Sequence, residues 1–137
     1  MPDGPEIPRG GSWQRFLRRL RSKRFRVADD SMRPTLVPGD CLYVDPLAYR
    51  EHPPARGDLV VTIDPVEPSR HLVKRVGFVP GGPGPPDGTT VPRGSVYLVA
   101  EVERHGRDSR EFGPVPVRSL VGRAYRCYRP IEHRREL

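Results

Sequence analysis

The 137-residue sequence contains no run of apolar residues long enough to cross a bilayer, which takes about 20 residues. Its N-terminus also lacks the uninterrupted apolar core of a secretory signal. We therefore expect a protein that does not span a membrane and that lies in the cytoplasm or on a membrane surface. Hydrophobic residues make up only 35% of the sequence, whereas 18 prolines and 14 glycines predict many turns and few long helices.

Cysteine and histidine are too few and too scattered to indicate a metal site. Cys41 and Cys127 lie far apart in the sequence, so neither a zinc site nor a disulfide framework is indicated. A single bridge between them stays open, but we favour two free thiols in a reducing compartment. The histidines show no metal-ligand spacing. The sequence therefore predicts no metal and no other cofactor.

The positive charge is concentrated at the N-terminus. Residues 1–26 contain eight of the 24 basic residues and two of the 17 acidic ones, and so carry +6 of the formal net charge of +7. Residues 27–137 are therefore close to neutral. This distribution does not indicate a nucleic-acid groove across the fold, and we expect no nucleic-acid partner.

The length fits one domain with short appendages. Residues 1–11 are rich in proline and glycine, which predicts a disordered tail. We expect a short amphipathic helix over residues 12–24, a single domain over residues 25–130, and a tail over residues 131–137. Within the domain, short apolar runs separated by turn signals predict a mainly β, antiparallel fold. The expected strands are 41–44, 59–63, 71–79, 95–102 and 120–128.

The predicted helix has one apolar and one basic face. Ser12 is a suitable N-cap, and the apolar face comprises Trp13, Phe16, Leu17 and Leu20. Three interpretations of this helix stay open. It can pack its apolar stripe on its own domain, bind nucleic acid, or make a peripheral contact with an anionic membrane through residues 12–26.

Lysine is almost absent from the sequence. Of the 24 basic residues only Lys23 and Lys74 are lysines. Arginine serves wherever a cation alone is needed, so Lys74 indicates a position that needs an amine able to lose its proton. In a strand, the Lys74 side chain lies on the same side as Leu72 and Val76, and this apolar setting favours the neutral amine. The alternative is a lysine whose ammonium reaches water at a strand end.

Ser31 lies in a turn-forming segment before an apolar strand, which places its hydroxyl on a rigid loop. A serine and a neutral lysine can act together as a nucleophile and its base. Four segments surround these two residues in order: Ser31-Met32-x-Pro34-Thr35-Leu36 with Gly39-Asp40; Gly57-Asp58-Leu59-Val60-Val61; Val73-Lys74-Arg75-Val76-Gly77; and Asp108-Ser109-Arg110-x-Phe112-Gly113-x-Val115. Together they resemble the sequence boxes of the type I signal peptidase family. The segment Phe112-Gly113-Pro114-Val115-Pro116 is also similar to the corresponding segment of the proteases that trim the N-terminus of nickel superoxide dismutase.

The resemblance implies a serine endopeptidase that removes a leader or propeptide after small residues, on a signal-peptidase-like β fold. Ser31 is the implied nucleophile and its backbone N–H an oxyanion donor, while Lys74 is the implied general base. Met32 matches a residue that lines the substrate groove, and Asp108 and Arg110 match an ion pair that supports the site. The implied partner is an extended peptide segment of a precursor protein.

The sequence departs from the family pattern beside these residues. Asp29 stands two residues before Ser31, where the family has glycine or serine, and Gly106 stands two residues before Asp108, where it has serine. An inward carboxylate at Asp29 would repel a developing oxyanion. A second hypothesis is therefore a catalytically impaired peptide-binding module of the same fold. A self-cleaving repressor half is less favoured, since neither a helix-turn-helix domain nor an Ala-Gly cleavage site precedes Ser31. A basic nucleic-acid adaptor is also less favoured.

Overall fold

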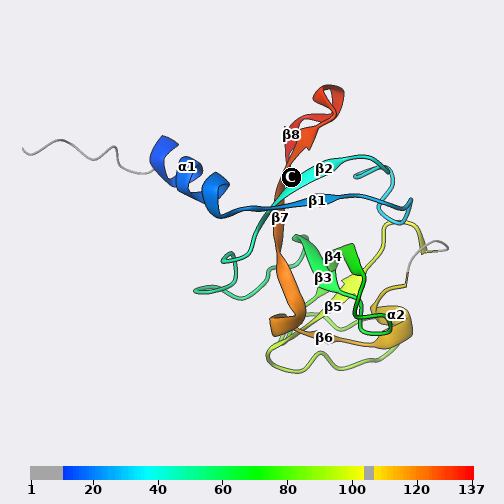
Figure 1. Cartoon of the computed structure of the whole chain (residues 1–137). Coiled ribbons are helices and arrows are strands. Elements are labelled where there is room, and N and C mark those ends of the chain that lie inside the picture. The colour runs from blue at the N-terminus through cyan, green and yellow to red at the C-terminus, as the bar shows by residue number, and fades with distance from the viewer. Residues whose placement is uncertain (1–10, 104–106) are drawn as a thin grey trace, which may run out of the picture.

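The computed structural model describes residues 11–103 and 107–137. The strands of this part of the chain pair antiparallel, which confirms the predicted mainly β fold (Figure 1). The elements are, in chain order, α1 (Ser12–Arg21), β1 (Lys23–Arg26), β2 (Cys41–Asp45), β3 (Leu59–Ile63), β4 (His71–Phe78), β5 (Ser95–Val99), α2 (Ser109–Phe112), β6 (Val115–Pro116), η2 (Val117–Ser119), β7 (Leu120–Arg129), η3 (Ile131–His133) and β8 (Arg135–Glu136).

Strand β7 connects the two parts of the sheet. The strand order is β1-β2-β7-β3-β4-β5-β6, and β8 also pairs with β7. Figure 1 shows β7 in orange, running from β1, β2 and β8 on one side to β3, β4 and β5 on the other. Its first half pairs with β3, from Leu120 opposite Thr62, and its C-terminal half pairs with β2 up to Arg129 opposite Cys41.

Two clusters of apolar side chains lie on opposite faces of β3 and β4. On β3, Val61 belongs to one cluster and its neighbour Val60 to the other, as alternation along a strand requires. Both faces of β3 are therefore covered, which is why this strand reads as a continuous apolar run. On β4, Val73 packs in the first cluster and Val76 in the second. Lys74 lies between them in the sequence and is almost fully buried.

The N-terminal helix is shorter than predicted. It ends at Arg21 because Lys23–Arg26 form β1, which pairs with β2. Ser12 is its first residue, and Gly11 occupies the N-cap position predicted for Ser12. In α1 no residue is buried, and Figure 1 shows the helix projecting away from the sheet. The interpretation in which α1 packs its apolar stripe on its own domain is therefore wrong.

Tails were predicted at both ends of the chain, over residues 1–11 and 131–137. Residues 131–137 were expected as a tail, yet η3 and β8 fold back, and Arg135 and Glu136 pair with Cys127 and Arg126 of β7. Of the tail predicted over residues 1–11, all but Gly11 lies outside the described residues. Over the described residues, no helix is long and apolar enough to cross a membrane.

Candidate active site

Ser31 and Lys74 lie next to one another. Nζ of Lys74 is 2.9 Å from Oγ of Ser31, although the two residues are far apart in the sequence. Ser31 lies in the turn that follows β1, and Lys74 lies in the middle of β4, opposite Val60 of β3. Ser31 is 0% exposed and Lys74 1% exposed. The two residues that sequence reasoning singled out are therefore in hydrogen-bond contact away from bulk water.

The turn around Ser31 is fixed from both sides. The backbone N–H of Val102 donates to the carbonyl oxygen of Ser31 at 2.9 Å. Within the turn, the N–H of Leu36 donates to the carbonyl oxygen of Met32 at 2.8 Å, and both side chains are fully buried in the first cluster. Apolar packing thus anchors the segment after the serine, so the hydroxyl is held by rigid backbone.

Asp29 contacts the nucleophile position directly. Its Oδ1 accepts a hydrogen bond from the backbone N–H of Ser31 at 3.0 Å. Burial alone would raise the pKa of the Asp29 carboxyl, but hydrogen bonds from Ser31 and the positive charge of Lys74 lower it below its ordinary value. The Asp29 carboxylate is therefore an anion, and it occupies the N–H that the family resemblance assigns to the oxyanion.

The amine of Lys74 is shifted toward its neutral form. Burial lowers the pKa of Lys74 below its ordinary value of 10.5. The negative charges of Asp29, Asp108 and Asp64 raise this pKa, but less than burial lowers it, and the positive charge of Arg110 lowers it further. An uncharged amine beside a hydroxyl can accept its proton, which is the chemistry expected of a general base.

Asp108 and Arg110 form a network behind the lysine. Asp108 is 1% exposed, and its carboxylate accepts hydrogen bonds from the N–H groups of Ala100 at 2.8 Å and Arg110 at 2.9 Å. The guanidinium of Arg110 pairs with the same carboxylate and also with Glu103 at 2.7 Å. Burial would raise the pKa of the Asp108 carboxyl, but these hydrogen bonds lower it. The network connects to the serine turn, because Ala100 lies two residues before Val102.

Other residues named by sequence reasoning are placed differently. Met32, expected to line a substrate groove, is 0% exposed and packs in the first apolar cluster beneath the serine turn. Gly106 lies outside the described residues. Cys41 and Cys127 are free thiols, so the bridge left open between them is not formed. Among the described residues, no cluster of three or more histidine, cysteine, aspartate or glutamate side chains could hold a metal ion.

Sequence reasoning missed Asp64, which lies at the end of β3. Asp64 is 0% exposed, accepts a hydrogen bond from the N–H of Val66 at 2.9 Å, and has Nη2 of Arg107 at 3.0 Å from its Oδ2. Its charge acts on the pKa of Lys74. In the sequence, Asp64-Pro65 indicates only a turn. The influence of Asp64 on Lys74 arises from the pairing of β3 with β4, which the sequence does not display.

Comparison with known proteins supports the family predicted from the motifs. The family model described as signal peptidase, peptidase S26 matches residues 15–83. A mitochondrial ATP-independent inner membrane protease subunit 1b of Arabidopsis thaliana is 38% identical over 68% of this chain and 62% of the relative. The mitochondrial inner membrane protease subunit 1 of Schizosaccharomyces pombe is 33% identical over 74% of this chain and 72% of the relative.

The chain therefore belongs to the signal peptidase S26 family, which confirms the resemblance seen in its sequence boxes. A relative named as a signal peptidase I-1 in Synechocystis is 27% identical over 72% of this chain. The match covers 62% of the length of both the Arabidopsis protein and the mouse mitochondrial inner membrane protease subunit 1. The narrower resemblance to nickel superoxide dismutase maturation proteases stays a prediction.

Proposed function

We propose that this protein is a serine endopeptidase that uses Ser31 and Lys74 as a catalytic dyad. The observation that carries the proposal is the 2.9 Å separation of Ser31 Oγ and Lys74 Nζ in a buried setting. Burial favours what the reaction needs from the amine, since it lowers the pKa of Lys74 and so shifts the amine toward the neutral form that accepts a proton.

In the proposed reaction, Lys74 takes the proton of the Ser31 hydroxyl as the oxygen attacks a peptide carbonyl. The protonated amine then donates this proton to the departing amine, and an acyl ester remains on Ser31. A water molecule, activated by the neutral Lys74, hydrolyses the ester and regenerates the serine. The N–H of Ser31 can stabilise the oxyanion once the Asp29 carboxylate has moved away from it.

The proposed substrate is an extended peptide segment of a precursor protein, cut after small residues. Membership in the signal peptidase S26 family supports this substrate class. Extended peptides bind by adding a strand to an exposed sheet edge. Because the Ser31 hydroxyl is 0% exposed, the bound peptide has to displace a neighbouring side chain to reach it. Asp29, which is exposed and hydrogen-bonded to Ser31, is the side chain best placed to move.

Cleavage of an alanine-rich leader peptide, followed by mass spectrometry, tests the dyad. Ser31→Ala and Lys74→Ala should each lower kcat by at least roughly a thousandfold. Lys74→Arg should be equally inactive, since guanidinium keeps its proton. Lys23→Ala removes the other lysine, which is exposed, and is the matched control that keeps full activity. Unchanged turnover in a Ser31 or Lys74 variant would remove the dyad assignment.

The hydrogen bond between Asp29 and Ser31 also favours a second candidate, a peptide-binding module without activity. In this case the wild-type protein binds the leader peptide, and mass spectrometry detects no cleavage over long incubation. Site-specific cleavage that depends on Ser31 excludes this candidate.

We further propose that residues 12–26 contact a membrane surface. The observation that favours this contact is the exposure of the apolar side chains of α1, which range from 42% exposed at Leu17 to 67% at Leu20. Basic side chains flank them on the same helix, as is typical of helices that lie in the headgroup region.

A further inference from the structure

A cleft of about 740 Å³ lies between α1 and the end of the sheet formed by β2, β7 and β8. Seven arginines and a single glutamate line it. Four of these arginines come from α1 and β1, and three come from β7 and the segment after η3. The cleft therefore combines residues from the two ends of the chain, and we call it the arginine cleft.

Within the part of the chain that the structure describes, few carboxylates pair with the arginines of the arginine cleft. Arg18 pairs with Asp45 at 3.5 Å and Arg126 pairs with Glu136. Over residues 11–103 and 107–137, the other five arginines have no carboxylate oxygen within 4.0 Å: Arg15, Arg19, Arg24, Arg129 and Arg134. Guanidinium groups crowded in this way repel one another, and an anion with several oxygens relieves the repulsion.

Three stacked tyrosines hold the arginines in place. The rings of Tyr43 and Tyr128 lie 4.2 Å apart, and the ring of Tyr125 lies 6.3 Å from that of Tyr43. The guanidinium carbon of Arg18 lies 3.7 Å from the centre of the Tyr125 ring. Tyr43 and Tyr125 are each only 8% exposed. The rings of Tyr43 and Tyr125 are therefore covered by one another and by arginine, and leave little surface on which a nucleic-acid base could stack.

The apolar side of α1 adjoins the arginine cleft. Phe16 and Leu20 line a smaller hollow together with Arg19, Arg24 and Tyr43, and three of these lining residues belong to both hollows. Trp13 and Phe16 are 55% and 52% exposed. A surface that places aromatic and aliphatic side chains beside unpaired arginines matches the boundary between lipid headgroups and acyl chains.

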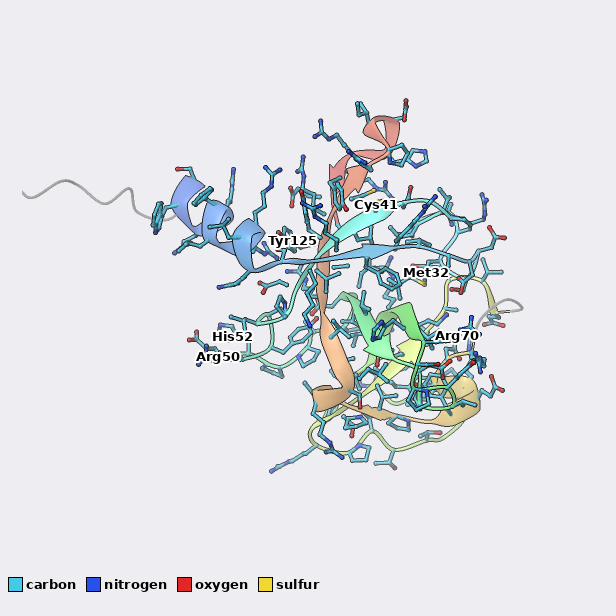
Figure 2. All side chains as sticks on the ribbon, viewed as in Figure 1. Met32, Cys41, Arg50, His52, Arg70 and Tyr125 are labelled. Atoms are coloured by element: carbon cyan, nitrogen blue, oxygen red, sulfur yellow. The ribbon has the colours of Figure 1, made fainter. Side chains whose placement is uncertain are left out.

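We propose that the arginine cleft binds the phosphate headgroups of an anionic bilayer while the apolar side chains of α1 enter the boundary below them. This inference rests on the membrane contact proposed above and extends it to Arg129 and Arg134, outside residues 12–26. Figure 2 shows Tyr125 close to α1, with the labelled Met32 and Arg70 farther from this helix.

Docking at the cleft also limits the distance of Ser31 from the lipid surface. Strand β1 follows α1 after Ser22 alone, and the chain then leads directly to Ser31. Ser22 is held in place, since its hydroxyl contacts the hydroxyl of Tyr125 at 2.6 Å. Ser31 is the tenth residue after Arg21, and this segment reaches at most roughly 33 Å when extended.

The test uses the full chain and vesicles of phosphatidylcholine with or without phosphatidylglycerol. Trp13 is the only tryptophan of the sequence, so a blue shift of its fluorescence reports entry of α1 into the boundary. We expect this shift with the anionic vesicles and little or none with the neutral ones. Arg129→Gln combined with Arg134→Gln should weaken partitioning into anionic vesicles by roughly thirtyfold. Each arginine near an anionic surface strengthens binding by about the same factor, and the double variant loses two of them.

Arg93→Gln combined with Arg118→Gln is the matched control. Both arginines are exposed, and they flank β5 and β6, away from α1 in Figure 1. This control changes the net charge equally and should partition like the wild type. Equal partitioning of the two double variants would overturn the assignment of the cleft, even where the Trp13 shift supports the contact through residues 12–26.

Two further outcomes also decide the matter. Binding of a single-stranded oligonucleotide in preference to anionic vesicles, with no Trp13 shift, would overturn the proposal in favour of nucleic acid. Ser31→Ala should bind vesicles like the wild type while losing peptide cleavage. Vesicle binding and peptide cleavage are thus read separately, so a failure of the cleft is distinguishable from a failure of the dyad.

Discussion

The carboxylate of Asp29 accepts a hydrogen bond from the backbone N–H of Ser31 at 3.0 Å. In the proposed reaction, this N–H is a donor to the oxyanion that forms when Ser31 attacks. A carboxylate in this place competes for the donor and repels the developing negative charge. Asp29 therefore holds the site in a form that has to rearrange before the transition state is stabilised.

Replacing Asp29 with glycine should speed the reaction. Loss of one oxyanion donor typically costs about 100-fold to 1,000-fold in kcat, so freeing the Ser31 N–H should raise kcat by roughly tenfold or more. Steady-state cleavage of the leader peptide measures this effect. Asp30→Gly is the matched control, because it removes a neighbouring carboxylate that pairs with Arg33 and should leave kcat unchanged. A slower Asp29→Gly enzyme would show instead that the carboxylate assists the reaction.

The rate of cleavage should increase with pH. The base has to be neutral to accept a proton, and burial lowers the pKa of Lys74 below 10.5. As pH rises through this lowered value, the neutral fraction increases, so kcat/KM should increase and then level off below pH 10.5. The pH profile of kcat/KM for the leader peptide measures the pKa of this base. A profile that falls with rising pH, or that inflects at 10.5 or above, contradicts the assignment of the base.

Asp29→Gly should move this profile to lower pH. The negative charge of Asp29 raises the pKa of Lys74. Removing this charge should therefore lower the pKa of Lys74 further. Asp30→Gly again serves as the control. A shift to higher pH would contradict the electrostatic contact between Asp29 and Lys74.

The contact between Ser31 and Lys74 could be predicted from the sequence, for a chemical reason. In a chain that uses arginine almost everywhere, a lone lysine in an apolar strand indicates an amine that has to lose its proton, and the serine box supplies its partner. The antiparallel fold was also predictable, because short apolar runs between glycine and proline turns leave few other architectures.

Other features depend on contacts that the sequence does not display. Asp29 could turn outward or inward, and the structure selects the local turn in which its carboxylate accepts the N–H of Ser31, two residues on. The helix was predicted to continue to residue 24, but pairing of Lys23–Arg26 with β2 overrides helical periodicity. Met32 was assigned to a groove because it matches a groove-lining residue of the family, yet its side chain packs in the first apolar cluster.

Asp108 should be needed for stability, because it is buried with its hydrogen bonds satisfied. Asp108→Ala leaves the N–H of Ala100 and the guanidinium of Arg110 without their acceptor, and should lower the free energy of unfolding by about 3 kcal/mol. Arg110→Gln should cost less, since the Arg110 side chain is 34% exposed. Chemical denaturation of the two variants measures the difference. Equal costs would contradict this ranking.

The pH dependence of stability follows from the lowered pKa of the Asp108 carboxyl. The unfolded chain takes up this proton near the ordinary value of 3.8, and the folded chain does so only at lower pH. The stabilisation is therefore fully present above pH 3.8 and is lost as pH falls through the folded value. The wild type should lose stability faster than Asp108→Ala as pH falls below 3.8. Parallel curves for the two proteins would contradict this contribution.

Gly122 should tolerate no larger side chain, because β7 passes very close to the end of β2 at this position. A Cβ atom at Gly122 would lie 2.6 Å from the carbonyl carbon of Asp45 and 2.9 Å from Cα of Pro46. These are backbone atoms at the end of β2 and just after it, so they cannot move aside cheaply, and Gly122→Ala should cost roughly 3 kcal/mol. Gly84→Ala is the control, since the nearest atom to its Cβ lies 3.8 Å away. Thermal unfolding of both variants measures the costs, and a Gly122→Ala protein as stable as Gly84→Ala would show that β2 and β7 do not approach this closely.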